Sequence, residues 1–167
     1  GANDRAARGN PELDELFSQL GAAPDAAVAA PIEQAIWVEW SDSGSPTVNV
    51  LLERATAAET AGDAELAGRF LDQASDLAPE YAEPWNRRAN LAYRAEDYRG
   101  AIAAIQETLK REPRHFGALA GLGLIYEELG QQRAALEAFR AALAIHPHYE
   151  TAIQGVRRDR KSTRLNS

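Results

Sequence analysis

The sequence predicts an all-α protein, an α-solenoid built from three successive helical hairpins. Apolar residues make up 45% of the 167 residues, which is enough for a packed core. Alanine, the strongest helix former, is used heavily, whereas the β-branched and aromatic residues that favour strands are sparse after residue 50. The chain also matches itself when it is shifted by one repeat unit, and this periodicity is typical of stacked helical hairpins.

Charge and residue content exclude several classes of function. The net charge of −7 repels phosphate backbones, so we expect no nucleic-acid partner. The absence of cysteine excludes disulfides, thiolate metal sites and a cysteine nucleophile. No apolar run approaches the roughly 20 residues of a membrane helix, so we expect no membrane insertion. A glycine-rich phosphate loop, HExxH and GxSxG are all missing, and we therefore expect neither catalysis nor a cofactor.

Two amphipathic segments precede the repeats. We expect residues 1–10 to be disordered and residues 11–47 to form a helical hairpin followed by a loop, packed on the first repeat. Ser45 is a predicted N-cap, with Pro46 at the first helical position after it. The apolar stripes, spaced as in amphipathic helices, are Leu13, Leu16, Phe17 and Leu20 in 11–20 and Val28, Ile32, Ile36 and Trp40 in 25–40.

Three repeat units follow over residues 48–149. They run 48–81, 82–115 and 116–149 without a gap. Five positions within the unit agree in all three copies, which indicates one structural plan used three times. The matching sets are Pro79, Pro113 and Pro147; Ala67, Ala101 and Ala135; Leu71, Ile105 and Phe139; Leu51, Trp85 and Leu119; and Ala55, Ala89 and Gly123.

Each conserved spacing has a physical reason. Gly62 and Gly130 stand where the first helix of a unit ends, and glycine tolerates the positive φ of a helix C-cap. Asp63 and Asp97 are placed to cap the second helix. The paired sets of small residues allow two helix backbones to come close. Each repeat-ending proline stops the second helix, because proline removes a helical N–H and restricts the residue before it.

These features, with the motifs ALAGLGLIYEELG and DLAPEYAEPWNRRANLAY, resemble the tetratricopeptide repeat family of helical hairpins. The first two units depart from the family pattern: Arg54 and Arg88 replace a large apolar residue, and Glu96 replaces the turn glycine. Ala58 and Ala92 replace the usual aromatic residue, whereas Tyr126 retains it. We therefore expect the third unit to be the most stable.

The two ends of the chain carry separate expectations. Residues 150–160 are predicted to form a capping helix, and a fourth repeat cut short is the alternative. Residues 161–167 match the in-frame translation of a widely used sequencing adapter, so we interpret them as a non-native tail. The chain starts at Gly1, which predicts a missing or processed N-terminus. The hairpin with its Ser43–Val48 loop resembles short, exported alphaproteobacterial members of the family, which favours a periplasmic address.

The family resemblance implies a protein or peptide partner in a concave groove formed by the first helix of each unit. Asn86 and Asn90 lie one turn apart and offer amide donors and acceptors, while Leu52, Tyr93 and Leu124 offer apolar contact. The implied groove positions are Asn49, Leu52, Thr56 and Glu59 in the first unit, Glu83, Asn86, Asn90 and Tyr93 in the second, and Gly117, Ala120, Leu124 and Glu127 in the third.

Several alternatives accompany this hypothesis of a non-catalytic scaffold or adaptor. Self-association driven by Trp37 and Trp40, giving a homo-oligomer, is one; an accessory domain of a larger protein is another. The carboxylate clamp that some family members use for chaperone tails is not expected, because its cationic positions hold Leu52, Gly117 and Gly121. His146-Pro147-His148 lacks a third ligand, so we expect no metal there.

Overall fold

The computed structural model describes residues 9–165, so the expected disorder of residues 1–8 lies outside the described part of the chain. Asn10, also expected to be disordered, instead caps the first described helix by accepting a hydrogen bond from the Leu13 N–H. The helices are α2 (Pro11–Ala22), α3 (Ala26–Ser41), α4 (Pro46–Thr60), α5 (Ala64–Leu77), α6 (Glu83–Arg94), α7 (Tyr98–Arg111), α8 (Phe116–Glu128), α9 (Gln132–Ile145) and α10 (Glu150–Leu165).

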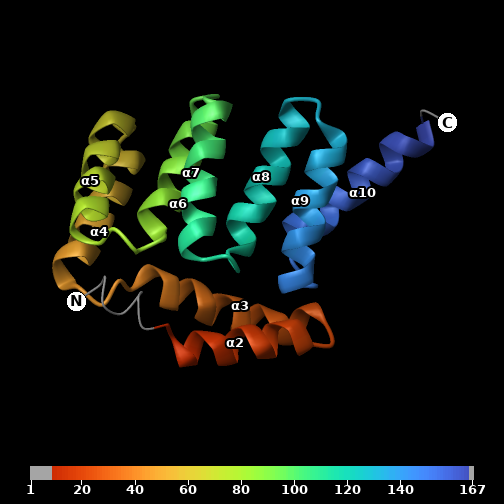
Figure 1. Ribbon diagram of the computed structural model, residues 1–167, viewed down its shortest axis with the longest axis horizontal. Coiled ribbons are helices and arrows are strands. Elements are labelled where there is room, and N and C mark those ends of the chain that lie inside the picture. Colours follow the sequence, from red (N-terminus) through yellow and green to blue (C-terminus); the bar gives the residue numbers. More distant parts are fainter. Residues whose placement is uncertain (1–8, 166–167) are drawn as a thin grey trace.

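The prediction of an all-α solenoid is confirmed. The hairpins α4–α5, α6–α7 and α8–α9 stand side by side in a row, α2 and α3 run along this row beneath the ends of the hairpins, and α10 packs on α9 (Figure 1). None of the described helices combines the length and the hydropathy that a membrane crossing requires. The α10 helix continues through Lys161 to Leu165, five residues past the predicted end of the cap.

Local backbone chemistry fixes the hairpin turns as the sequence predicts. Gly62 and Gly130 have φ values of 80° and 73°, and Glu96 is held at φ 58° at the equivalent turn. The carboxylates of Asp63 and Asp97 accept hydrogen bonds from backbone N–H groups in the first turns of α5 and α7. Ser45 likewise caps α4. These contacts satisfy helix-end groups that would otherwise lack partners.

Small residues allow the third hairpin and the last helix to enclose one aromatic ring. A β-carbon on Gly123 of α8 would lie 2.6 Å from the Phe139 ring, and one on Gly155 of α10 would lie 2.5 Å from the same ring. The Phe139 side chain, on α9, is fully buried. The ring therefore fills the space that two glycines leave, and α10 closes the end of the solenoid by this contact.

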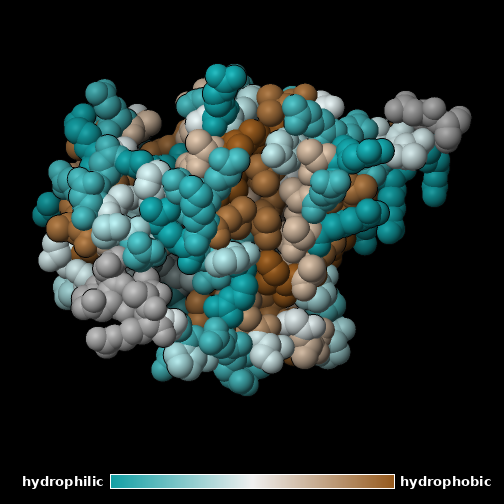
Figure 2. Space-filling model, viewed as in Figure 1, coloured by the Kyte–Doolittle hydropathy of each residue, from teal (hydrophilic) through white to brown (hydrophobic). Residues whose placement is uncertain are grey.

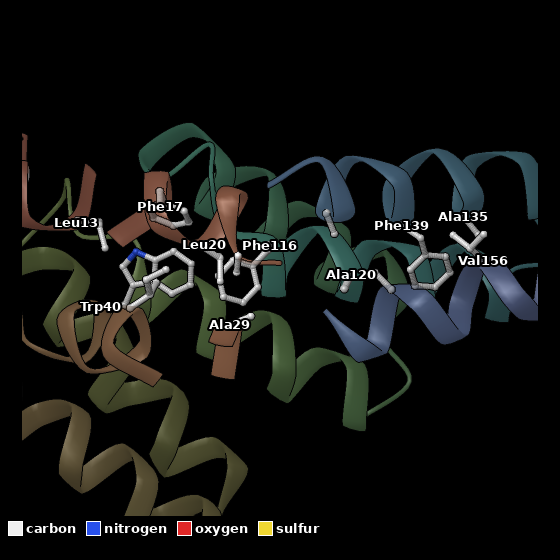
Figure 3. Packing of buried hydrophobic residues seen from close by; sticks show 14 residues of the cluster. Leu13, Phe17, Leu20, Ala29, Trp40, Phe116, Ala120, Ala135, Phe139 and Val156 are labelled. Carbon is white, nitrogen blue, oxygen red and sulfur yellow. The ribbon is translucent and has the colours of Figure 1, made fainter. Parts of the chain in front are cut away.

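The N-terminal hairpin packs on the third repeat, so its expected place on the first repeat is wrong. Phe17 of α2 and Trp40 of α3 share one buried cluster with Phe116 of α8 (Figure 3). The ring centroids of Trp40 and Phe116 are 5.2 Å apart. Val28, placed by its spacing on the apolar stripe, is 44% exposed instead. Since α3 runs past the repeats before the chain turns into α4, its neighbours in space are distant in sequence.

The inter-repeat loops hold this hairpin. Tyr81 and His115 occupy the same position in successive units. The Tyr81 hydroxyl donates to the Trp40 carbonyl, whereas the His115 ring stacks on the Trp40 ring. The other two histidines contact the hairpin as well: His146 Nε2 lies 2.7 Å from a Glu33 carboxylate oxygen, and His148 Nε2 lies 2.9 Å from the Ala23 carbonyl oxygen.

Candidate functional site

A small cavity opens between α6 and α8, the first helices of the second and third units. Its volume is about 80 Å³. The α6 wall carries polar and aromatic side chains, whereas the α8 wall is apolar and includes Gly121 and Leu124. Figure 2 shows hydrophobic residues gathered in a band over α8, with hydrophilic residues on both sides. The lining residues are Asn86, Ala89, Asn90, Tyr93, Ile105, Gly117, Ala118, Gly121, Leu124 and Ile125.

The two asparagines of α6 line this cavity at different depths. Asn86 is buried, whereas Asn90, one helical turn later, is exposed. Each side-chain amide carries two N–H donors and a carbonyl acceptor. An extended peptide offers alternating N–H and C=O groups, so two amides spaced along one helix face can bind successive backbone groups. This arrangement supplies hydrogen bonding without a charged group.

Tyr93 and Leu124 provide the apolar part of the site. Both are partly exposed at the cavity. The Tyr93 ring meets the Tyr98 ring edge to face, with centroids 5.9 Å apart, and this contact limits the orientations that Tyr93 can adopt. Desolvation, together with the Glu128 and Glu96 carboxylates, raises the pKa of Tyr98, so that phenol stays neutral. An aromatic ring and an aliphatic side chain thus line the cavity beside the amides.

Arginines from α6 close the adjacent space between α4 and α6. Arg87 Nη1 donates to the Leu52 carbonyl at 3.1 Å and to the Thr56 hydroxyl at 2.8 Å. Arg94 Nη1 lies 3.4 Å from a Glu59 carboxylate oxygen. The predicted groove positions Thr56 and Glu59 are therefore joined to the second repeat. Neither arginine was among the residues singled out from the sequence.

Other predicted groove residues serve the fold. Leu52 and Ala120 are 3% and 1% exposed and belong to the core, so the expected ligand contact at Leu52 is corrected. Asn49 bonds Ser43 in the α3–α4 loop. Glu83, 7% exposed, lies beneath the inter-repeat loops rather than in the cavity.

Two predicted groove positions of the third unit, Gly117 and Glu127, are contacted by the N-terminal hairpin and by α10. Trp37 packs closely on Gly117, since a β-carbon on residue 117 would lie 2.7 Å from the indole. Glu127 accepts two hydrogen bonds from Arg158 of α10, at 3.0 and 2.8 Å. Arg158 belongs to a basic run that is visible in the sequence. Its pairing with Glu127 depends on how α10 packs, which the spacing of residues along the chain does not predict.

A metal has no evident place in the described residues. No group of three or more His, Asp or Glu side chains among them is arranged to hold an ion. His146 and His148, the pair considered from the sequence, bond Glu33 and the Ala23 carbonyl, respectively. Their contacts attach the hairpin to the repeats.

Known proteins match the chain over most of its length. A tetratricopeptide repeat family model matches residues 86–150. A TPR repeat-containing protein of Rhizobium etli is 42% identical over 144 residues, which cover 86% of this chain and 71% of that protein.

Solved structures share the fold. The structure of MamA has a TM-score of 0.64 at 23% identity, covering 73% of this chain and 72% of its own. The first TPR of Spaghetti (RPAP3), bound to an HSP90 peptide, has a TM-score of 0.66 at 19% identity, covering 74% of this chain and 96% of its own. At these identities the structural likeness extends to the arrangement of helices.

Proposed function

Because the chain belongs to the tetratricopeptide repeat family, we propose that it is a non-catalytic scaffold or adaptor that binds an extended protein segment between α6 and α8. The family fold is typical of protein–protein interaction modules. The peptide named for the Spaghetti structure belongs to that protein. The ligand of this chain is instead inferred from its own cavity.

One observation supports the proposal above the others. Asn86, Asn90, Tyr93 and Leu124 line the same cavity and come from two different repeats. Amide groups would bind the ligand backbone, and the two apolar side chains would contact its side chains. Binding of this kind recognises an extended conformation together with one or two apolar residues, and it requires no terminal carboxylate.

The flanking contacts limit the length of the bound segment. On the side of the first repeat, Arg87 occupies the space between α4 and α6. At the start of α8, Trp37 covers Gly117. The ligand is therefore expected to contact α6 and α8 and to leave α4 unoccupied, so a short segment is sufficient.

A site-specific crosslink tests this placement. A photoreactive phenylalanine analogue at Leu124 is expected to capture a partner in cells that express the full-length gene. The control places the same analogue at Gln106, an exposed residue of α7 outside the cavity. Capture at Leu124 without capture at Gln106 supports the proposal; equal capture at both positions contradicts it.

Self-association through Trp37 and Trp40 is the second candidate. Trp40 is buried and Trp37 is partly buried, and each contacts His115 and Phe116 within the chain. A homo-oligomer formed through this pair would therefore use the exposed part of Trp37, and light scattering at several protein concentrations tests it. A periplasmic address stays a prediction from the family resemblance, and fractionation of cells that carry the full-length gene tests it.

A further inference from the structure

A second and larger pocket lies where the N-terminal hairpin meets the inter-repeat loops. Its volume is about 420 Å³. We call it the loop pocket and define it by Leu13, Trp40, Tyr81, Glu83, Arg111 and His115, which are among its lining residues. It shares no residue with the cavity between α6 and α8, so an inference about it does not depend on the proposed function.

Three buried polar atoms of the loop pocket have no hydrogen-bond partner among residues 9–165, the part of the chain that the structure describes. They are Glu83 Oε2, His115 Nε2 and Trp40 Nε1. The three residues are 7%, 1% and 7% exposed. Burying a polar atom without a partner is unfavourable, so three of them at one pocket call for a physical explanation.

Two neighbouring contacts define which of these atoms donate. His115 Nδ1 accepts a hydrogen bond from the Ala118 N–H at 3.0 Å, so in the neutral imidazole the proton is on Nε2. His115 Nε2 and Glu83 Oε2 are 3.8 Å apart, too far for a direct hydrogen bond. The residues that line the pocket therefore carry two unpartnered donors, His115 Nε2–H and Trp40 Nε1–H, and one unpartnered carboxylate acceptor, Glu83 Oε2.

The two rings that carry the donors are stacked on each other. The Trp40 and His115 rings stack with centroids 4.1 Å apart and planes 11° apart. Glu83 is held through its other oxygen, since Oε1 lies 3.6 Å from Arg87 Nε. In Figure 3 the indole nitrogen of Trp40 points toward Leu13, another residue of the loop pocket. The three atoms thus belong to side chains with fixed positions.

We infer that the loop pocket binds a primary carboxamide group. A carboxamide oxygen has two lone pairs, one for each donor, and its NH₂ group donates to Glu83 Oε2. A carboxylate ligand would be repelled by Glu83 and would provide no donor. An ammonium group would pair with Glu83 but would leave both N–H groups unsatisfied. The carboxamide matches all three atoms at once.

Titration of the full chain with three small probes tests the inference. The probes are butyramide, butyrate and butylammonium, which share an alkyl chain and differ in the polar group. The readouts are the Trp40 indole N–H and the His115 ring signals in NMR spectra. Butyramide is expected to give saturable shifts and to bind at least about tenfold more tightly than the other two, a difference of one or two hydrogen bonds.

Two indole variants form a matched pair. Trp40→Phe removes the unpaired N–H and keeps an aromatic ring, so it should weaken butyramide binding at least about fivefold, read at His115. Trp37→Phe changes the neighbouring indole, which also contacts His115 but is not a loop-pocket residue, and should leave binding unchanged. Glu83→Gln removes the repulsion of carboxylates and should reduce the preference of the pocket for butyramide over butyrate.

Two results would overturn the inference. One is the absence of saturable shifts at Trp40 and His115 with butyramide. The other is butylammonium binding as tightly as butyramide, which would assign the pocket to cations.

Discussion

The indole ring of Trp40 stacks on the imidazole ring of His115, with centroids 4.1 Å apart. Trp40 lies near the end of α3, and His115 is the last residue of the second repeat and the N-cap of α8, so this pair joins segments 75 residues apart, the difference between positions 115 and 40. The stack attaches α3 to the solenoid beside the inter-repeat loops. It also places the hairpin against the third unit, where the largest buried cluster lies.

Trp40→Ala is expected to destabilise the whole protein. The substitution removes a buried ring that contacts Phe17, Phe116 and His115, and such losses cost about 3–5 kcal/mol. The free energy of unfolding, measured in urea, tests this. Val38→Ala, at a 60% exposed position of the same helix, is the control and should change it by less than about 0.5 kcal/mol. Similar losses for both variants would show that the hairpin does not depend on the stack.

Stability is expected to fall in mild acid because of His146. Burial lowers the pKa of His146, and this effect outweighs the hydrogen bond and charge of Glu33, which act upward; His148 lowers it further. The unfolded chain, with a histidine pKa of about 6.5, then binds a proton more readily than the folded chain. The His146 contribution is therefore complete above about pH 6.5 and decreases as the pH falls toward the lower folded pKa.

Melting temperatures between about pH 7.5 and pH 5 measure this dependence. Glu33→Gln should steepen it, because the variant removes the interactions that favour protonated His146. His146→Gln should flatten it. A slope that is unchanged in both variants would mean that other groups carry the pH dependence.

Gln131→Asp is expected to stabilise the third repeat. Asp63 and Asp97 cap α5 and α7, whereas Gln131, at the equivalent position before α9, makes no side-chain capping bond. An aspartate there would accept a hydrogen bond from the first turn of α9 and add about 1 kcal/mol to the free energy of unfolding. Asp63→Ala is the reverse test and should cost about as much. A destabilised Gln131→Asp chain would contradict the capping account.

Gly155→Ala is expected to loosen the attachment of α10. The new methyl group would approach the Phe139 ring to 2.5 Å, so the ring or the helix must move, at a cost of about 1–3 kcal/mol. Phe139→Leu in the same chain should recover part of the loss, and a double-mutant cycle in chemical denaturation measures the coupling. Purely additive effects would show that the two side chains do not meet.

The sequence predicts local features well, because their causes lie within a few residues. Turn glycines, aspartate caps and close helix approaches follow from backbone geometry and side-chain size, and the structure has Gly62, Asp97 and Gly123 in those roles. The same reasoning identifies Asn90 and Tyr93 beside Leu124, which the structure brings to one cavity. The function of that cavity remains our proposal.

The placement of the hairpin could not be read from spacing alone. An amphipathic stripe shows that a helix packs, without showing against which partner, so Trp40 was correctly expected to be buried but not beside Phe116. The contacts of the α6 arginines could not be predicted for the same reason. Arg87 of the second repeat donates a hydrogen bond to Thr56 of the first repeat, and that contact depends on how the units stack. The repeat length is known from the sequence, but the relative rotation of successive units is not.

The most direct test of the proposed function is the dissociation constant of a peptide selected from a random display library on the full chain. Asn90→Ala combined with Tyr93→Ala should weaken binding at least about tenfold, because it removes an amide and a ring from the cavity. Gln73→Ala combined with Gln106→Ala, at exposed positions on α5 and α7, should leave the dissociation constant unchanged. Equal affinity of both double variants, with both chains folded, would contradict binding between α6 and α8.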